Sequence, residues 1–202
     1  MTDRRTFLML AAGAGLASLV PSAARAQAAE KATAFIKSTG DRLVAVVNGA
    51  GSLADKRRDI SKVIIGSVDV DAIGRFCLGR FWRQASAEQQ KSYQSLFQEV
   101  LITSITSKLG EFQGVRFTIG RARTQEENEV VATVVERPNN APANVDWIVA
   151  NAASTPKIID LVAEGTSLRI TQRSDYASYL QRNNNSIDAL LAAMKKQVDA
   201  AV

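Results

Sequence analysis

The sequence contains no histidine and a single cysteine, Cys77, among its 202 residues. Without histidine, neither a Ser-His-Asp triad nor a Cys-His pair can be assembled, and zinc sites built from histidine and cysteine are excluded too. One cysteine cannot form an internal disulfide. Because Cys77 stands between apolar neighbours in "RFCLGRF", we interpret it as a small buried hydrophobic residue. We expect no catalytic residue, no metal and no cofactor.

Phosphate-binding loops and long apolar runs are missing as well. The segment "NGAGS" (48–52) has the wrong spacing for a phosphate-binding loop and does not follow a strand. The formal net charge of +5 is a mild excess spread along the chain, so no nucleic-acid partner is indicated. What remains is a globular composition with 46% hydrophobic and 22% charged residues.

The first 26 residues have the three parts of a secretory signal peptide. These are Arg4 and Arg5, a mildly apolar run over 7–20, and a small-x-small site ending at Ala26. The stretch "DRRTFLM" matches the twin-arginine pattern, which we favour over the general export route. An uncleaved anchor is the alternative, but the run is short for a membrane span of about 20 residues. We expect residues 1–26 to be removed, leaving 27–202 as one domain in a bacterial periplasm.

Helical periodicity comes first along the chain, and strand periodicity follows it. Helical spacing of apolar residues covers 30–66 with a break at 48–52, then 70–80, 86–108, 168–181 and a last helix capped by Ser186. Ser86 and Gln89 form a capping box at the start of the third of these segments.

Four consecutive segments between these helices have the pattern of strands: 115–122, 129–137, 144–152 and 157–165. The last of them places Ile159, Leu161 and Ala163 on one face and Asp160 on the other, which we expect to face solvent. Short turns between sequential strands imply antiparallel pairing. We therefore predict an α+β fold, with a four-stranded antiparallel sheet packed against several helices.

Aromatic residues are scarce, and five of the twelve lie in "FCLGRFWRQASAEQQKSYQSLF" (76–97). Such a cluster fits an ordinary core, and it also fits the wall of a chamber for an apolar ligand. The strand over 129–137 is apolar on both faces. This fits a sheet buried on both faces, and it also fits a sheet whose inner face lines a cavity. Composition alone leaves both open.

If the protein is an enzyme, its catalytic groups would be carboxylates and tyrosines. Asp69 and Asp71 are explained by helix capping rather than by a glycosidase pair. Asp160 as a base with Tyr93 or Tyr176 as a donor could isomerise a steroid-like ligand, but no pattern fixes this pairing.

Two long stretches resemble a known family. They are "VDVDAIGRFCLGRFWRQASAEQQKSYQSLFQEVL" and "KIIDLVAEGTSLRITQRSDYASYLQRN", followed by "SIDALLAAMKK". In this order and spacing they resemble the periplasmic phospholipid-binding shuttles of the Mla (maintenance of lipid asymmetry) type, also called toluene-tolerance auxiliary proteins. Thr166 stands where relatives often carry valine.

The resemblance implies a monomeric carrier that encloses phospholipid acyl chains in an apolar cavity between the sheet and the helices. Its partners would be inner- and outer-membrane lipid-transfer complexes, including an ABC transporter. A hopanoid or other polycyclic lipid is the alternative cargo, and an adaptor without ligand is a further alternative. The residues expected to line the cavity are Phe76, Phe81, Phe97, Leu101, Ile105, Trp147, Val149 and Tyr176.

Overall fold

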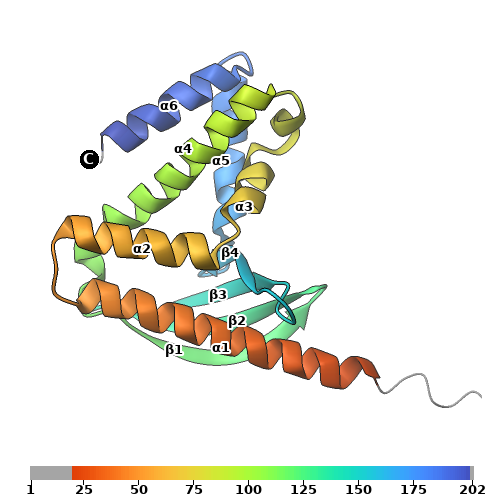
Figure 1. Cartoon of the computed structure of the whole chain (residues 1–202), viewed down its shortest axis with the longest axis vertical. Helices are drawn as coiled ribbons and strands as arrows, with labels where there is room; N and C mark the ends of the chain where they lie inside the picture. The colour runs from red at the N-terminus through yellow and green to blue at the C-terminus, as the bar shows by residue number, and fades with distance from the viewer. Residues whose placement is uncertain (1–19, 201–202) are drawn as a thin grey trace, which may run out of the picture.

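Helices and one antiparallel sheet make up residues 20–200, the part of the chain that this computed structural model describes (Figure 1). The helices are α1 (Val20–Asn48), α2 (Leu53–Ser67), α3 (Val70–Leu78), η1 (Gly79–Arg83), α4 (Ala87–Thr106), η2 (Leu109–Phe112), α5 (Leu168–Arg182) and α6 (Ile187–Asp199). The strands are β1 (Arg116–Gln125), β2 (Asn128–Glu136), β3 (Ala143–Ala150), β4 (Lys157–Ala163) and β5 (Thr166–Ser167).

The α+β class and the antiparallel sheet are confirmed. The sheet has five strands rather than four, because two residues after the β4 turn add the short strand β5. Most of the predicted leader lies outside the described residues, and α1 begins at Val20. Within residues 20–200, no helix combines the length and the apolarity needed to cross a membrane.

The five strands follow one another in sequence order, so each strand pairs with its neighbour in the chain. Val131 of β2 lies opposite Ala122 of β1 and Trp147 of β3, and Trp147 lies opposite Leu161 of β4. Residues directly opposite one another share a face. These side chains therefore define one face, here called the inner face, which also carries Phe117, Ile119, Thr133, Val135 and Val145.

Helix α1 covers part of the inner face. It packs on β1 and β2, as Figure 1 shows in the lower half of the molecule. The closest approach is at Gly40, where a Cβ atom would come within 2.2 Å of the Phe117 ring. At the end of α1, Asn48 accepts a hydrogen bond from the Gly114 amide and donates one to the Val115 carbonyl.

Replacing Gly40 with alanine is expected to lower the free energy of unfolding by about 1–3 kcal/mol, since the Phe117 ring must move or α1 must lift. Gly66→Ala is the matched control, because nothing lies within 4 Å of a Cβ atom there and alanine favours a helix. Urea unfolding followed by circular dichroism compares the two. Equal midpoints for both variants would contradict this packing.

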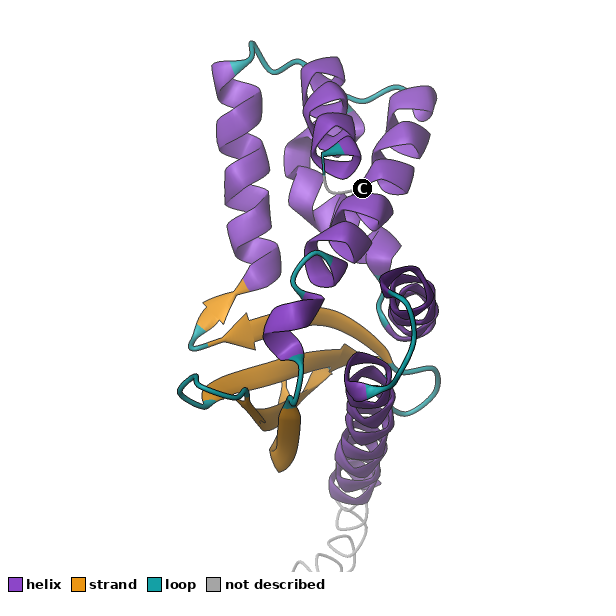
Figure 2. Cartoon of the chain, turned by 90° about the vertical axis from the view of Figure 1, so that its left-hand side faces the viewer, coloured by secondary structure: helices purple, strands orange, loops and turns teal. Residues whose placement is uncertain are grey.

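The remaining helices pack mainly on one another, above the sheet (Figure 2). Helix α4 contacts α2, α3 and α6, while α5 contacts α3, α6 and β4. The predicted capping box of Ser86 and Gln89 is present at the start of α4, and Ser186 caps α6 as expected. Asp69, also as expected, caps α3 by accepting a hydrogen bond from the Ala72 amide.

Two separate hydrophobic cores result from this arrangement. The helical core joins buried side chains of α2 to α6, including Tyr93, Phe97 and Leu180. The sheet core lies between α1 and the inner face, around Ile36 and Val131. Val68, after α2, contacts both cores. One domain usually has one continuous hydrophobic core, whereas this fold has two cores with a boundary between them.

Candidate functional site

An apolar ridge on α4 loses its cover as it approaches the sheet. Phe97, Leu101 and Ile105 are spaced four residues apart and therefore lie in one row along the helix. Phe97 is only 4% exposed, Leu101 is half-buried, and Ile105 is 37% exposed. The helix then ends in η2, which leads directly into β1, so the exposed end of the ridge is the end connected to the sheet (Figure 1).

The inner face of the sheet loses its cover in the same way. Val131 and Val149 are fully buried beneath α1, whereas Val145, Trp147 and Leu161 on the same face are only half-buried. The Trp147 indole is fixed in place because its Nε1–H donates a hydrogen bond of 2.9 Å to the Thr133 hydroxyl. An oriented ring that keeps accessible apolar surface is suited to contact an apolar ligand.

We call the accessible apolar side chains of these two walls the helix–sheet seam. They are Leu101 and Ile105 of α4, Phe112 of η2, and Val135 and Trp147 of the inner face. Phe112 and Val135 both contact the helical core, which brings that core to the edge of the sheet. The seam thus combines half-buried apolar side chains with the exposed Ile105, which is the chemical environment that hydrocarbon requires.

The eight residues predicted to line a cavity are divided between the two cores. Phe81, Phe97 and Tyr176 are buried in the helical core, with Phe76 and Leu101 packed against it. Val149 is buried in the sheet core, and Trp147 packs against that core. Ile105 is exposed. The residues of this set that lie at the seam are therefore Leu101, Ile105 and Trp147.

None of the eight residues lines either of two hollows on the surface of the described residues. The first, of about 430 Å³, lies between the starts of α4 and α6 and is lined mainly by polar side chains. The second, of about 460 Å³, lies between α2 and α4 beside Arg57 and Ile102. Arg57 there donates a hydrogen bond of 3.0 Å to the Thr103 hydroxyl. An enclosed apolar cavity at the seam accordingly stays a proposal.

Both tyrosines of the helical core, and Cys77 beside them, are held neutral by burial. Burial raises the pKa of Cys77 to about 12, so the thiol is inert and its interpretation as a buried hydrophobic residue is confirmed. Burial, followed by the proximity of Tyr176, raises the pKa of Tyr93 above its ordinary value. Burial likewise raises the pKa of Tyr176. None of these groups is prepared to transfer a proton near neutral pH.

The two tyrosine hydroxyls differ in their hydrogen bonding, which gives a testable contrast. Tyr93 donates a hydrogen bond of 2.9 Å to the Gly74 carbonyl, whereas the buried Tyr176 hydroxyl has no partner among the described residues. Tyr93→Phe should cost about 1 kcal/mol of stability, and Tyr176→Phe should cost nothing or stabilise. Thermal unfolding of both variants checks this, and a larger loss for Tyr176→Phe would contradict the assignment.

Asp160 is not on a solvent face, contrary to the sequence prediction; it is only 5% exposed. Its carboxylate accepts hydrogen bonds from the Ser167 hydroxyl at 2.6 Å and from the Arg169 amide at 3.1 Å. It also pairs with the Arg169 side chain at 3.3 Å. The reason is long-range: β5 folds back beside β4 and brings the start of α5 over Asp160.

Ser167 and Arg169 hold Asp160 in this turn, and neither role is predicted from the sequence. Ser167 caps α5 through the Ile170 amide and simultaneously donates to Asp160. A carboxylate at a helix N-terminus also interacts favourably with the helix dipole. The spacing of Asp160, Gly165 and Ser167 in "DLVAEGTSL" is the signal for this strand-to-helix turn, and Gly165 adopts the positive φ of 78° that the turn requires.

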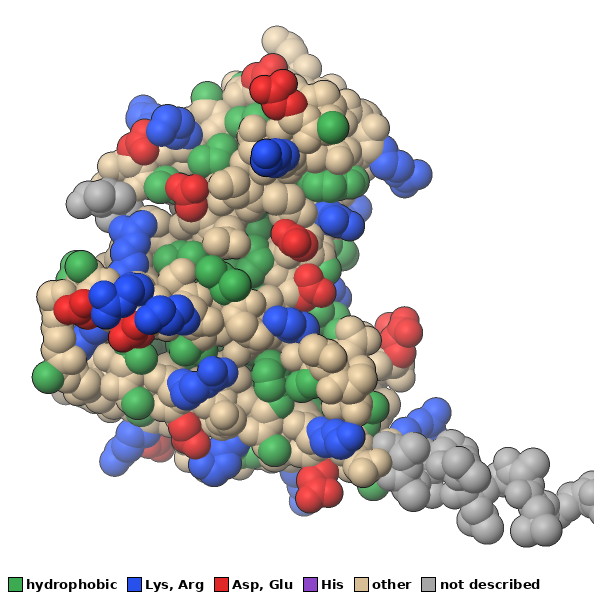
Figure 3. All heavy atoms as spheres, viewed as in Figure 1, with side chains coloured by type: hydrophobic (Ala, Val, Ile, Leu, Met, Phe, Trp, Pro, Cys, Tyr) green, Lys and Arg blue, Asp and Glu red, His purple; other side chains and the backbone are tan. Residues whose placement is uncertain are grey.

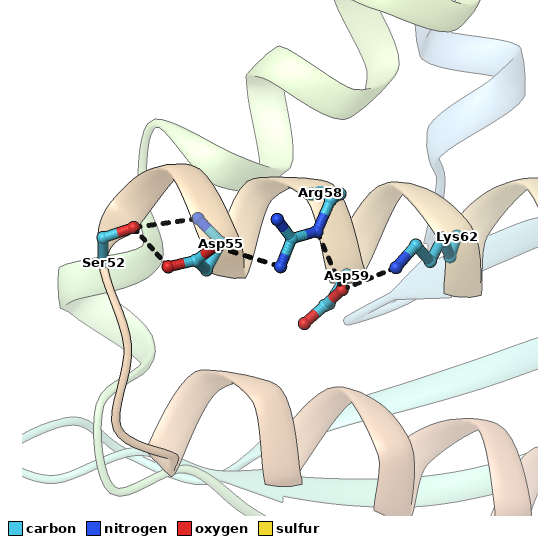
Figure 4. A network of polar contacts seen from close by, with 5 residues as sticks. All are labelled: Ser52, Asp55, Arg58, Asp59 and Lys62. Carbon is cyan, nitrogen blue, oxygen red and sulfur yellow. Dashed lines mark hydrogen bonds and ion pairs between the residues drawn. The ribbon is translucent and has the colours of Figure 1, made fainter.

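The exposed side of α2 is electrically balanced. Figure 4 shows Asp55, Arg58, Asp59 and Lys62 alternating along one side of α2, with ion pairs of 3.0 to 3.5 Å between neighbours. The Ser52 hydroxyl and then Arg58 lower the pKa of Asp55. In Figure 3 both signs of charge gather on this helix, and hydrophobic side chains gather between α2 and α4.

The described residues contain no group of three or more acidic, histidine or cysteine side chains that could hold a metal ion. The side chains at the seam are hydrocarbon, apart from the Trp147 indole, which is already hydrogen-bonded. The arrangement can therefore contact an apolar molecule, and it presents no group for bond making or breaking.

Comparison with known proteins shows the family and the fold of this chain. The chain is 22% identical over 144 residues to the toluene tolerance protein Ttg2D of Pseudomonas putida, covering 70% of this chain and 67% of that protein. It shares its fold with a phospholipid-binding protein of Ralstonia solanacearum, solved in complex with a phospholipid. That match has a TM-score of 0.74 and 22% identity, and covers 84% of this chain and 98% of the other. The family model described as MlaC protein matches residues 37–196, so this chain belongs to the MlaC family.

Proposed function

We propose that this protein is a non-enzymatic lipid carrier that holds the acyl chains of a phospholipid at the helix–sheet seam. The observation that carries the proposal is that Ile105 on one wall and Trp147 on the other keep accessible apolar surface inside an MlaC-family fold. Structural similarity to a protein solved with a phospholipid supports the choice of ligand.

The physical need for such a protein follows from the solubility of its cargo. Each methylene group exposed to water costs about 0.8 kcal/mol, so two acyl chains do not cross an aqueous compartment unaccompanied. In this proposal the chains lie between the apolar row of α4 and the uncovered part of the inner face. Residues 27–202 would act as one lipid-binding domain in the periplasm, after removal of the leader near Ala26. Cargo would be exchanged with complexes in the inner and outer membranes, including an ABC transporter.

An enzyme acting through Asp160 and a tyrosine is disfavoured by the geometry. The Asp160 carboxylate is occupied by the start of α5, and Tyr93 donates its proton to a backbone carbonyl. The proposed role of all three residues, Tyr176 included, is structural.

Native mass spectrometry of the purified protein, followed by solvent extraction, tests this function. The account predicts about one phospholipid per chain. A polycyclic triterpenoid in its place would identify a hopanoid carrier and overturn the choice of phospholipid. If the purified protein carries no lipid and takes up none from vesicles, the carrier function is wrong, and an adaptor without ligand is the remaining hypothesis.

A further inference from the structure

Four arginine side chains stack on aromatic rings where α3, η1 and α5 meet. Arg169 and Arg173 lie over the Phe76 ring, with guanidinium carbons 4.6 and 4.9 Å from its centroid. Arg80 lies over Phe81 at 5.0 Å, and Arg75 lies over Trp82 at 5.3 Å. We call these four residues the stacked-arginine surface. It explains why arginines alternate with aromatic residues in "RFCLGRFW".

Most of this positive charge is not neutralised. Within residues 20–200, Arg169 pairs with Asp160, while Arg75, Arg80 and Arg173 are exposed and form no ion pair. The exposed acids on the same helices, Asp71 and Asp175, pair with none of them. The exposed side of α2 differs from this surface, because its two cations are paired with two carboxylates (Figure 4).

A cation held over an aromatic ring is restrained in position, and a guanidinium has five N–H donors, more than this contact uses. A planar guanidinium donates two parallel hydrogen bonds to a phosphate, and one already held by a ring loses little entropy in doing so. Gly79 fixes the spacing between η1 and α5, since a Cβ atom there would lie 3.3 Å from the Arg173 guanidinium. The three free arginines are therefore preorganised phosphate donors.

Large apolar side chains lie beside these cations. Leu168 is 48% exposed and Ile170 is 58% exposed, and they flank Arg169 in the first turn of α5. Cations next to exposed aliphatic side chains match the boundary of an anionic bilayer, where phosphates lie above hydrocarbon. An acidic protein surface could form ion pairs with the arginines, but it would offer no hydrocarbon for the two aliphatic side chains to contact.

We propose that the stacked-arginine surface, together with Leu168 and Ile170, docks this protein on bilayers that contain anionic phospholipid. The inference rests on the proposed carrier function and adds to it the surface that meets the membrane. Docking there would bring the carrier to the bilayer without using the seam residues Leu101, Ile105 and Trp147.

Vesicle co-sedimentation tests the proposal. The protein is obtained by expressing the full chain, and its N-terminus is determined by mass spectrometry. The vesicles are phosphatidylcholine alone, or phosphatidylcholine with phosphatidylglycerol. The test variants are Arg80→Gln with Arg173→Gln, and Leu168→Ser with Ile170→Ser. The matched control is Arg58→Gln with Lys62→Gln on α2, which removes the same charge from a balanced surface.

The unaltered protein should bind the anionic vesicles and should lose this binding in high salt. Binding should fall about tenfold or more in the arginine variant, and clearly in the aliphatic variant, while the control stays within about twofold. Equal binding of the unaltered protein to both vesicle types would overturn the proposal, and so would an equal loss of binding in the control variant. The proposal would also be wrong if the arginine variant lost binding to an acidic partner protein while its vesicle binding was unchanged. Extraction of lipid from the same preparations reports on the carrier function separately.

Discussion

Replacement of Asp160 by asparagine should lower the free energy of unfolding by about 3 kcal/mol, although the side chain keeps its size. An amide offers one acceptor oxygen where the carboxylate offers two, so the Ser167 hydroxyl and the Arg169 amide cannot both keep their present acceptors, and the ion pair with the Arg169 side chain is lost. The start of α5 would then be held less firmly on β4.

Asp41→Asn is the matched control for Asp160. Asp41 is an exposed carboxylate whose one ion pair within residues 20–200 is with Lys37, one helical turn away, so its loss should change stability by less than about 0.5 kcal/mol. Urea unfolding of both variants provides the comparison. If the Asp160 variant had the same urea midpoint of unfolding as the unaltered protein, the capping role of Asp160 would be wrong. An acid–base role for Asp160 would then have to be considered again.

The second large effect is expected at the seam. Replacing Ile105 with aspartate places a carboxylate where the account places an acyl chain, and an unpaired charge is very costly in such surroundings. Lipid that co-purifies with the variant should fall to about one tenth or less of the usual amount. Stability should change little in the lipid-free protein, since Ile105 is 37% exposed and belongs to neither of the two described hydrophobic cores.

Leu53→Asp is the matched control for Ile105. Leu53 is also an exposed aliphatic residue, at the start of α2, and it is not one of the residues of the seam. Quantitative lipid extraction from both variants, alongside their unfolding midpoints, separates lost binding from lost folding. Equal lipid content in the two variants would remove Ile105 from the lipid site.

Local sequence signals predicted the elements well. The period of the apolar residues placed the helices and the strands β1 to β4, and the capping residues Ser86 and Ser186 mark helix starts that the structure confirms. Such signals act within one or two turns, so a single sequence contains them in full.

Long-range placement was predicted less well. Alternation along β4 predicted an exposed Asp160, because nothing in that segment reveals that residues 167–169 return to cover it. The pairing of β3 with β4 also shifts register between Ile148 and Val149, so simple alternation does not hold along the whole strand. The short β5 depends on the same return of the chain.

The lining residues show the same limit. Phe97 and Ile105 lie in one helical row and have the same apolar character in the sequence, yet the first is buried in the helical core and the second is exposed at the seam. Val149 and Trp147 lie on one face of β3, but Val149 is fully buried in the sheet core whereas Trp147 is half-buried at its margin. Periodicity predicts which face is apolar, whereas cover by another element decides which part of that face remains accessible.

The two tryptophans allow the most direct test of where acyl chains bind. Trp147 is on the inner face at the seam, and Trp82 packs against the helical core next to Tyr93. The variants Trp82→Phe and Trp147→Phe each leave one fluorescent reporter. Each is loaded with phospholipid brominated along its acyl chains, because bromine quenches only rings that it contacts. We predict strong quenching of Trp147 and little quenching of Trp82. Quenching of Trp82 alone, or of neither ring while lipid is bound, would contradict the placement of the acyl chains at the helix–sheet seam.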